Sequence, residues 1–218
     1  MIITVGGIKG GTGKSTAATN LAVMRRRAGF DVMLVDADEQ KSASEFVAQR
    51  EALGHGTIPC VQLVGKTVLA QVREMKARYS DIIIDTGGRD TASQRSALLA
   101  SDVLLLPFQP GNFDLWTIEQ VETMATEIRS VNERLAVLAY ISRGYPAGSD
   151  NEDAAGLLRE SAVLRLLDVT VIGRKAYNAA SGRGLAVAEA DRPDPKAVAE
   201  MDQLYNAVFG ATAVTAAA

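Results

Sequence analysis

Short runs of apolar and β-branched residues alternate along the chain with longer segments of helical periodicity. Within the short runs the apolar residues are continuous, which is typical of parallel strands covered by helices on both faces. The predicted strands are Ile2–Val5, Val32–Val35, Cys60–Val64, Ile82–Ile84, Val103–Leu106, Leu135–Ile141 and Val169–Ile172. The predicted helices are Lys14–Arg27, Ser42–Leu53, Val68–Tyr79, Ser93–Ala100, Leu115–Val131, Asp153–Leu167 and Pro195–Phe209. Because strands and helices alternate strictly, we expect right-handed βαβ units and an α/β fold, with a doubly wound, mostly parallel sheet flanked by helices on both faces.

No internal repeat, coiled-coil heptad or low-complexity linker interrupts this pattern. The sequence therefore predicts one domain over residues 1–210, a length that a single α/β domain commonly has. Residues 211–218 carry no charge and have few large apolar side chains to bury, so we expect them to form a flexible tail.

The chain has 218 residues, of which 47% are hydrophobic and 22% charged, fractions typical of globular proteins rather than of disordered or fibrous ones. Its formal charge of −3 does not by itself attract nucleic acid, so any contact with DNA needs a local basic patch. A single cysteine excludes a disulfide framework, a CxxC redox pair and a cysteine-ligated cluster within one chain. No apolar run approaches the roughly 18 residues of a membrane span, and the first residues lack the pattern of a signal peptide. A cytoplasmic protein without membrane contact is expected.

A glycine-rich segment with two lysines follows the first predicted strand. Glycines allow the backbone to curl and to point successive N–H groups at anionic oxygens, and the helix expected from Lys14 turns its positive dipole end toward the same anion. Lys14 would add a charge to the β- and γ-phosphates, and the Ser15 hydroxyl would ligate Mg²⁺. The sequence therefore predicts a nucleotide-phosphate site at Lys9, Gly10, Gly11, Thr12, Gly13, Lys14, Ser15 and Thr16.

This segment departs from the general GxxxxGK[ST] phosphate loop, because Ile8 stands where the first glycine belongs and an additional lysine, Lys9, precedes the glycine pair. KGGTGKST resembles the deviant Walker A motif of the ParA/MinD ATPases, a branch of the P-loop NTPases that dimerise around nucleotide. The resemblance implies that Lys9 reaches across a dimer interface to the phosphates of the partner's ATP, whereas Lys14 serves its own. Both lysines are thus candidate catalytic residues.

Asp36, Asp38 and Glu39 follow the second strand, and carboxylates at the carboxyl ends of parallel strands lie at the edge where open α/β sheets bind ligands. Three acids beside a phosphate site require a cation, so Mg²⁺ is expected. The stretch resembles the DxDPQ segment of the family, with Glu39 in place of its proline. The resemblance implies that Asp38 orients or deprotonates the attacking water and that Asp36 supports Mg²⁺. The alternative is that the two aspartates cap the helix predicted near Ser42.

The run Asp81–Gly88 is a hydrophobic strand that ends in Asp85 and, two residues later, a glycine pair. It resembles a Walker B strand, which implies that Asp85 holds Mg²⁺, through a water molecule, and that the backbone of Gly87 and Gly88 approaches the γ-phosphate. The family commonly has DxPP at this position, so the glycine pair leaves this loop less constrained.

Fewer motifs mark the second half of the chain. Ser142 and Arg143 end the sixth strand where the family contacts adenine, which makes Arg143 a candidate ATP contact; the alternative is a surface arginine. Trp116 begins a helix with apolar residues at helical spacing, and we expect it to face the core; the alternative, implied by the resemblance, is that this region borders the dimer interface and the partner surface. The last third resembles the half of ParA proteins that binds nucleoid DNA. The resemblance implies DNA contacts at Arg174, Lys175, Arg183, Arg192 and Lys196. The alternative is that these side chains are ordinary solvated surface charges.

The resemblance extends from Ile3 to about Leu204, nearly the whole chain. One cysteine is too few for the nitrogenase iron-protein and arsenite-pump branches of the family. Because the tail lacks the features of a basic amphipathic helix and the first predicted strand begins at Ile2, we expect neither a MinD role nor an N-terminal helix-turn-helix domain.

The resemblance thus implies a small ParA-type ATPase with ATP and Mg²⁺ as cofactors. A sandwich homodimer around ATP would bind DNA non-specifically and associate with the nucleoid, until a ParB-like or other cargo adaptor stimulates an otherwise slow hydrolysis. Such a cycle would drive plasmid or chromosome partition or position another cargo. Two alternatives remain: an ATP-gated scaffold for secretion or conjugative transfer, and a small-molecule kinase or synthetase with a phosphate loop.

Overall fold

The structure, a computed structural model, describes residues 1–89, 91–111 and 115–215. Its strands are β1 (Ile2–Val5), β2 (Val32–Ala37), β3 (Cys60–Gln62), β4 (Asp81–Thr86), β5 (Val103–Phe108), β6 (Ala136–Gly144) and β7 (Arg165–Ile172). Its helices are α1 (Lys14–Arg27), α2 (Ser42–Ala52), α3 (Thr67–Met75), α4 (Ala92–Leu98), α5 (Leu115–Arg129), α6 (Asp150–Arg159), α7 (Lys175–Ser181), the short 3₁₀ helix η1 (Val187–Glu189) and α8 (Pro195–Thr215).

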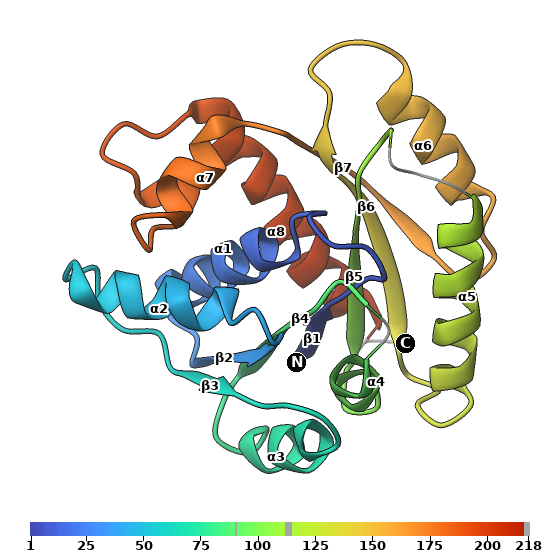
Figure 1. The fold of residues 1–218 in the computed structure, drawn as a ribbon, viewed down its shortest axis with the longest axis horizontal. Coiled ribbons are helices and arrows are strands. Elements are labelled where there is room, and N and C mark those ends of the chain that lie inside the picture. Colours follow the sequence, from blue (N-terminus) through green and yellow to red (C-terminus); the bar gives the residue numbers. More distant parts are fainter. Residues whose placement is uncertain (90, 112–114, 216–218) are drawn as a thin grey trace.

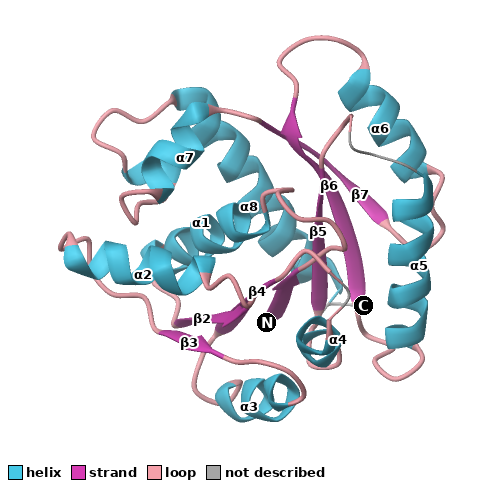
Figure 2. Ribbon diagram, viewed as in Figure 1, coloured by secondary structure: helices cyan, strands magenta, loops and turns pink. Residues whose placement is uncertain are grey.

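The strands lie side by side in the order β3-β2-β4-β1-β5-β6-β7, and every neighbouring pair is parallel. β1 lies in the middle, so the loop that follows it opens at the centre of the carboxyl edge of the sheet, between the ends of β4 and β5 (Figure 1). Helices cover both faces of the sheet (Figure 2). The prediction of a doubly wound parallel α/β sheet is confirmed.

Successive residues of the central strands alternate between apolar cores on the two faces. In β4, Ile83 packs with residues of α1, α2 and α8, whereas Ile82 and Ile84 pack with residues of α3 and α4. A further cluster from β5, β6, α5 and α6 continues this second layer beyond β1. Because both faces of the sheet are covered, the strands are apolar at successive positions, as their continuous hydrophobic runs indicated.

A helix is present where Asp153–Leu167 was expected, but its predicted end is wrong, because α6 ends at Arg159 and β7 begins at Arg165. The Ser161 hydroxyl accepts the N–H groups of Val163 and Leu164, at 3.2 and 3.0 Å, and this turn takes the chain out of the helix. In β7 the buried side chains then recur at every second position, as in a strand with one solvated face.

The C-terminal part differs from the expectations in two more places. α7 and η1, helices of seven and three residues, had no predicted counterpart. α8 continues to Thr215, past its expected end at Phe209. Residues 216–218 lie outside the described residues, so the flexible tail at 211–218 stays a prediction.

The interpretation of Trp116 as a core residue is wrong, because its side chain is 74% exposed. Ile118, Val121, Met124 and Ile128 of the same helix do line the core, as predicted. At about 100° per residue, Trp116 lies roughly 140° from the centre of that buried stripe, so the helix that buries the stripe must expose the indole.

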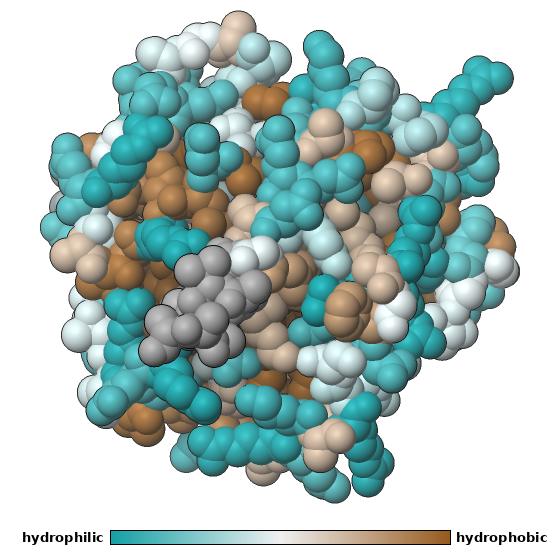
Figure 3. All heavy atoms as spheres, turned by 180° about the vertical axis from the view of Figure 1, so that it is seen from behind, coloured by the Kyte–Doolittle hydropathy of each residue, from teal (hydrophilic) through white to brown (hydrophobic). Residues whose placement is uncertain are grey.

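No helix in the described part of the chain is long and apolar enough to cross a bilayer. On the face shown in Figure 3, hydrophobic residues lie among hydrophilic ones and gather toward one side of the view. The absence of membrane contact stays a prediction.

Candidate functional site

The loop after β1 has the backbone geometry of a phosphate cradle. Gly11 and Gly13 have φ angles of 76° and 95°, a region that residues with a Cβ rarely adopt. Gly13 precedes the first residue of α1, so the unpaired N–H groups of that helix open into the curl of the loop. The glycines of the motif therefore serve the conformation that the sequence analysis assigned to them.

The loops after β2 and β4 pack directly against this cradle. A Cβ on Gly88 would lie 2.5 Å from the Gly10 nitrogen and 2.7 Å from the Lys9 carbonyl carbon, so only glycine fits there. A Cβ on Gly87 would lie 3.1 Å from Asp38 Oδ1, which places that carboxylate against the same glycine pair. The phosphate loop and both acidic loops thus meet at one point.

Asp36 and Asp85 are register partners on the neighbouring strands β2 and β4, so the two carboxylates stand at the same level of the sheet. Asp36 accepts the backbone N–H of Asp38 at 3.2 Å and of Ser44 at 2.7 Å. Asp85 is fully buried, and neither of its carboxylate oxygens has a hydrogen-bond partner among the described residues. The helix-capping alternative thus holds in part for Asp36, whereas Asp85 lacks a partner for its charge.

The electrostatics of the cradle follow from this burial. Burial raises the pKa of Asp85 from 3.8 to about 7; the nearby Asp36 carboxylate adds to the rise, and the Lys14 ammonium opposes it. Burial lowers the pKa of Lys14, and its Nζ donates a hydrogen bond of 2.8 Å to the Lys9 carbonyl oxygen. A buried carboxylate without a partner is costly, and a divalent cation would remove that cost.

These residues can contribute to a magnesium site. The described residues include no group of three or more His, Cys, Asp or Glu side chains that would hold a metal ion by themselves. Mg²⁺ commonly takes one or two carboxylates and completes its shell with water and phosphate oxygens. Ser15, Asp36 and Asp85 fit such an incomplete set, so the metal would bind together with a nucleotide.

A cavity of about 820 Å³ lies between the cradle and the acidic loops. Its lining includes ten of the predicted site residues: Gly10, Gly11, Gly13, Lys14, Ser15, Thr16, Asp38, Gly87, Gly88 and Arg143. Asp36 and Asp85 are buried and do not line it. Lys9 and Thr12 do not line it either; both line a separate cavity on the β5 side of the loop. The structure therefore brings most of the predicted site together and places Lys9 apart from it.

Arg143 stands at the border of the phosphate cavity and a second cavity of about 320 Å³ between the ends of β6 and β7. Its φ angle is 53°, and its Nη1 donates a hydrogen bond of 2.5 Å to the Gly11 carbonyl oxygen. The arginine thus fastens the phosphate loop to the end of β6.

Gln94 is a site residue that the sequence analysis missed. It is fully buried in α4, and its Oε1 accepts the Gly7 N–H at 3.1 Å and the Thr86 hydroxyl at 3.0 Å. It therefore ties the start of the phosphate loop to the end of β4. No motif announces a glutamine in a short helix, so its role depends on the packing of α4.

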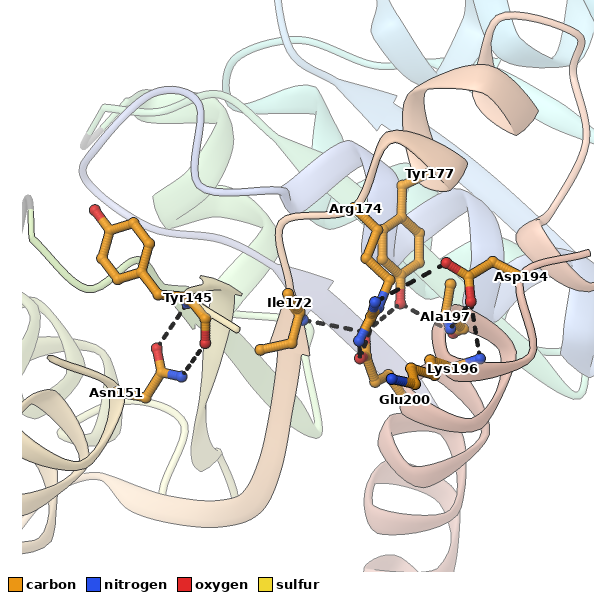
Figure 4. Close-up of polar contacts among 9 residues, drawn as sticks. All are labelled: Tyr145, Asn151, Ile172, Arg174, Tyr177, Asp194, Lys196, Ala197 and Glu200. Atoms are coloured by element: carbon orange, nitrogen blue, oxygen red, sulfur yellow. Dashed lines mark hydrogen bonds and ion pairs between the residues drawn. The ribbon is translucent and has the colours of Figure 1, made fainter. Parts of the chain in front are cut away.

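The basic residues of the last third differ in their surroundings. Arg174 is bound to Glu200 through Nε at 2.9 Å and Nη2 at 2.7 Å, and Asp194 lies 4.0 Å from it (Figure 4). The same Glu200 accepts the Tyr177 hydroxyl at 3.1 Å. Arg174 is thus part of the packing between β7, α7 and α8. Arg183 forms an exposed ion pair with Asp191, and Lys175, Arg192 and Lys196 are exposed.

Comparison with known proteins agrees with this geometry. Residues 3–187 match the family model of the CobQ/CobB/MinD/ParA nucleotide binding domain. A maintenance of carboxysome distribution protein A from Gloeobacter kilaueensis is 30% identical over 180 residues, which are 82% of this chain and 80% of the relative.

Two solved structures share the fold. A plasmid partition protein from Borrelia burgdorferi bound to AMPPNP aligns with a TM-score of 0.73 at 19% identity, over 96% of this chain and 98% of that one. The septum site-determining protein MinD from Pyrococcus horikoshii, complexed with Mg-ADP, aligns with a TM-score of 0.72 at 18% identity, over 95% of each chain. Because the family model covers far more than half of the residues, this chain belongs to the CobQ/CobB/MinD/ParA nucleotide-binding family, as its phosphate loop indicated.

Proposed function

We propose that this protein is an ATPase of the ParA type that forms a sandwich dimer around ATP, binds DNA without sequence preference and positions a cargo. The observation that carries the proposal is the different placement of two lysines in one loop. Lys14 lines the phosphate cavity, whereas Lys9 lines the cavity on the other side of the loop. A lysine in that position suits the nucleotide of a second subunit better than its own.

ATP would lie along the carboxyl edge of the sheet. Its phosphates would be held by the backbone of the cradle, by Lys14 and by the glycine pair after β4. Its base would enter the cavity of about 320 Å³ between β6 and β7, with Arg143 at the junction. The residues we assign to ATP binding are Lys9, Gly10, Gly11, Thr12, Gly13, Lys14, Ser15, Thr16, Gly87, Gly88 and Arg143.

Ser15, Asp36 and Asp85 would hold Mg²⁺. When bound, Mg²⁺ supplies positive charge that offsets the charge on the phosphate oxygens. Asp85, at the level of Asp36 on the neighbouring strand, has a buried carboxylate without a hydrogen-bond partner in the described part of the chain, which suits contact with the ion or its water. Both Asp36 oxygens already accept backbone N–H groups, which suits a role through water.

Asp38 would orient or deprotonate the attacking water. Its carboxylate lies against Gly87 at the phosphate cavity, and its Oδ1 accepts the Gln40 N–H at 3.1 Å, which holds its position. A single carboxylate is a modest catalyst for this reaction, so we expect slow turnover until an adaptor acts. Loss of the γ-phosphate would release the loops that it orders and let the dimer separate.

DNA would be bound by exposed basic residues of the last third, Lys175, Arg183, Arg192 and Lys196. Because the net charge of −3 does not itself attract DNA, binding needs such local basic residues, and a dimer doubles their number. About six phosphate contacts would lower the affinity roughly a thousandfold between about 50 and 200 mM salt. Binding to the nucleoid would follow from the same contacts.

Three measurements test the proposal together: sedimentation, ATPase rate and DNA retention, each with ATP, with ADP and without nucleotide. We expect a dimer and DNA retention with ATP alone, and slow hydrolysis. Fast turnover that depends on a small acceptor would favour a kinase or synthetase instead, and a stable ATP dimer without any hydrolysis would favour a scaffold.

Two variants sharpen the test. Lys9→Ala should abolish the ATP-dependent dimer and keep much of the ATP affinity, whereas the matched variant Lys14→Ala should lose ATP binding itself. Asp38→Ala should bind ATP and remain a dimer because hydrolysis stops. A Lys9→Ala protein that dimerises like the parent would remove the cross-subunit role, and normal hydrolysis by Asp38→Ala would remove that residue from the mechanism.

A further inference from the structure

The cavity on the β5 side of the phosphate loop is separate from the phosphate cavity, and of its described lining residues only Lys9, Gly10 and Thr12 belong to the site described above. Its volume is about 490 Å³, and its lining is shared between the phosphate loop, the end of β5 and the first turns of α5. Its apolar walls come from Ile8, Leu106, Phe108 and Val121, and Lys9 and Gly10 lie in its lining. ATP phosphates in the neighbouring cavity and a base between β6 and β7 would leave this space open.

The exposed Trp116 lies next to this cavity in the chain but does not line it. Thr117 and Val121 of α5 line the cavity, and Trp116 precedes Thr117. Trp116 is exposed because it lies roughly 140° around the helix from the centre of the buried stripe. The indole is therefore exposed to solvent and leaves the cavity of its own protomer unfilled.

We propose that Trp116 of each protomer inserts into this cavity of the partner protomer in the ATP-bound dimer. The inference rests on the proposed function, which places Lys9, a lining residue, at the subunit interface. A two-fold interface brings the same surface patch of both subunits together, so a patch with one protruding anchor and one adjacent cavity can complement itself. Tryptophan is the residue that most often anchors such interfaces when it enters a desolvated pocket.

The chemistry of the cavity suits an indole. Burial of an aromatic ring is most favourable where apolar side chains replace water around it. The apolar lining residues from β5 and α5 provide such surroundings. The cavity also opens beside polar backbone of the phosphate loop at Gly7 and Gly10. Filling it would press on the loop that carries Lys9, so nucleotide binding and dimer formation would support each other.

Trp116 is the only tryptophan in the sequence, so its fluorescence reports its own surroundings. The experiment follows emission and acrylamide quenching of the full chain with a non-hydrolysable ATP analogue and Mg²⁺, over a series of protein concentrations, with sedimentation in parallel. We expect a blue shift and protection from acrylamide that rise with the dimer fraction. With ADP, or in Lys9→Ala, the emission should stay that of an exposed indole.

Variants supply the second readout. Trp116→Ala should weaken the ATP-bound dimer about tenfold or more while the monomer still binds the analogue. Trp116→Phe should recover part of the affinity. Val131→Ala is the matched control, because Val131 is an equally exposed apolar residue just beyond the other end of α5 and should leave dimerisation unchanged.

The outcomes separate this inference from the proposed function. A dimer whose indole stays exposed, or a Trp116→Ala protein that dimerises like the parent, overturns the inference alone. A blue shift that appears in the Lys9→Ala monomer, or that does not depend on protein concentration, also overturns it, because the indole then closes over its own protomer. Absence of any ATP-dependent dimer overturns the proposed function and this inference with it.

Discussion

The buried carboxylate of Asp85 should make the protein without nucleotide and metal less stable than its Asp85→Asn variant at alkaline pH. The pKa of Asp85 rises from 3.8 to about 7, and one pKa unit corresponds to about 1.4 kcal/mol. The ionised carboxylate therefore costs the folded state about 4 kcal/mol above pH 7. Because the folded state holds this proton more tightly than the unfolded state does, the contribution of Asp85 to stability falls as pH rises from about 4 to 7.

Asparagine cannot ionise, so Asp85→Asn removes this penalty. Its amide also needs partners, and unpaired buried donors cost about 1–3 kcal/mol, which lowers the net gain at about pH 8 to roughly 2 kcal/mol. The cost of the unpaired amide does not depend on pH, so it cancels when the stability difference between variant and parent is compared at two pH values. The advantage of the variant should therefore shrink by about 3 kcal/mol from about pH 8 to about pH 5.

The assay is urea unfolding in EDTA at both pH values, followed by circular dichroism. Asp36→Asn is the control: its carboxylate accepts two backbone N–H groups, so that variant should lose stability at both pH values. With Mg²⁺ and ATP the order should reverse, because ligand binding stabilises the parent and not Asp85→Asn. A stability difference between Asp85→Asn and the parent that is the same at both pH values would refute the reasoning, since the carboxylate would then not be buried without a partner.

Three further predictions concern packing. Gly88→Ala should lower ATP affinity at least tenfold, because its Cβ would displace the phosphate loop; unchanged affinity in a calorimetric titration would contradict that close approach. Glu189→Gln should cost about 3 kcal/mol in urea unfolding at neutral pH, because it leaves the buried Arg50 guanidinium without its carboxylate. Burial alone would raise the pKa of Glu189, but the hydrogen bonds from Arg50 outweigh it and lower that pKa, so the loss should fade below about pH 4.5, and a pH-independent loss would contradict the pairing. Arg174→Ala should destabilise the fold and leave the salt dependence of DNA binding unchanged, whereas Lys175→Ala should reduce the salt slope by about one in a filter-binding series; the reverse result would exchange their roles.

The order of the strands along the chain, the βαβ alternation and the phosphate loop could be predicted because each depends on contiguous residues. KGGTGKST places glycine where the loop takes positive φ angles, and α1 begins and ends at the predicted residues. The continuous apolar runs predicted strands with both faces covered, and the acids Asp36 and Asp85 were predicted at the carboxyl ends of their strands, where they lie. These features follow from local conformation and from the period of hydrophobic positions, which the sequence expresses directly.

Tertiary structure alone decided how segments distant in sequence meet. The register that pairs Asp36 with Asp85, the contact of Gly88 with Gly10 and the buried bonds of Gln94 depend on which strand lies beside which. The partners of Arg174, the exposure of Trp116 and the placement of Lys9 beside a separate cavity depend likewise on packing between elements. All these features have the same physical cause: the burial and the hydrogen bonds of a side chain depend on its neighbours in space. A motif or a hydrophobic period in one sequence does not indicate which residues those neighbours are.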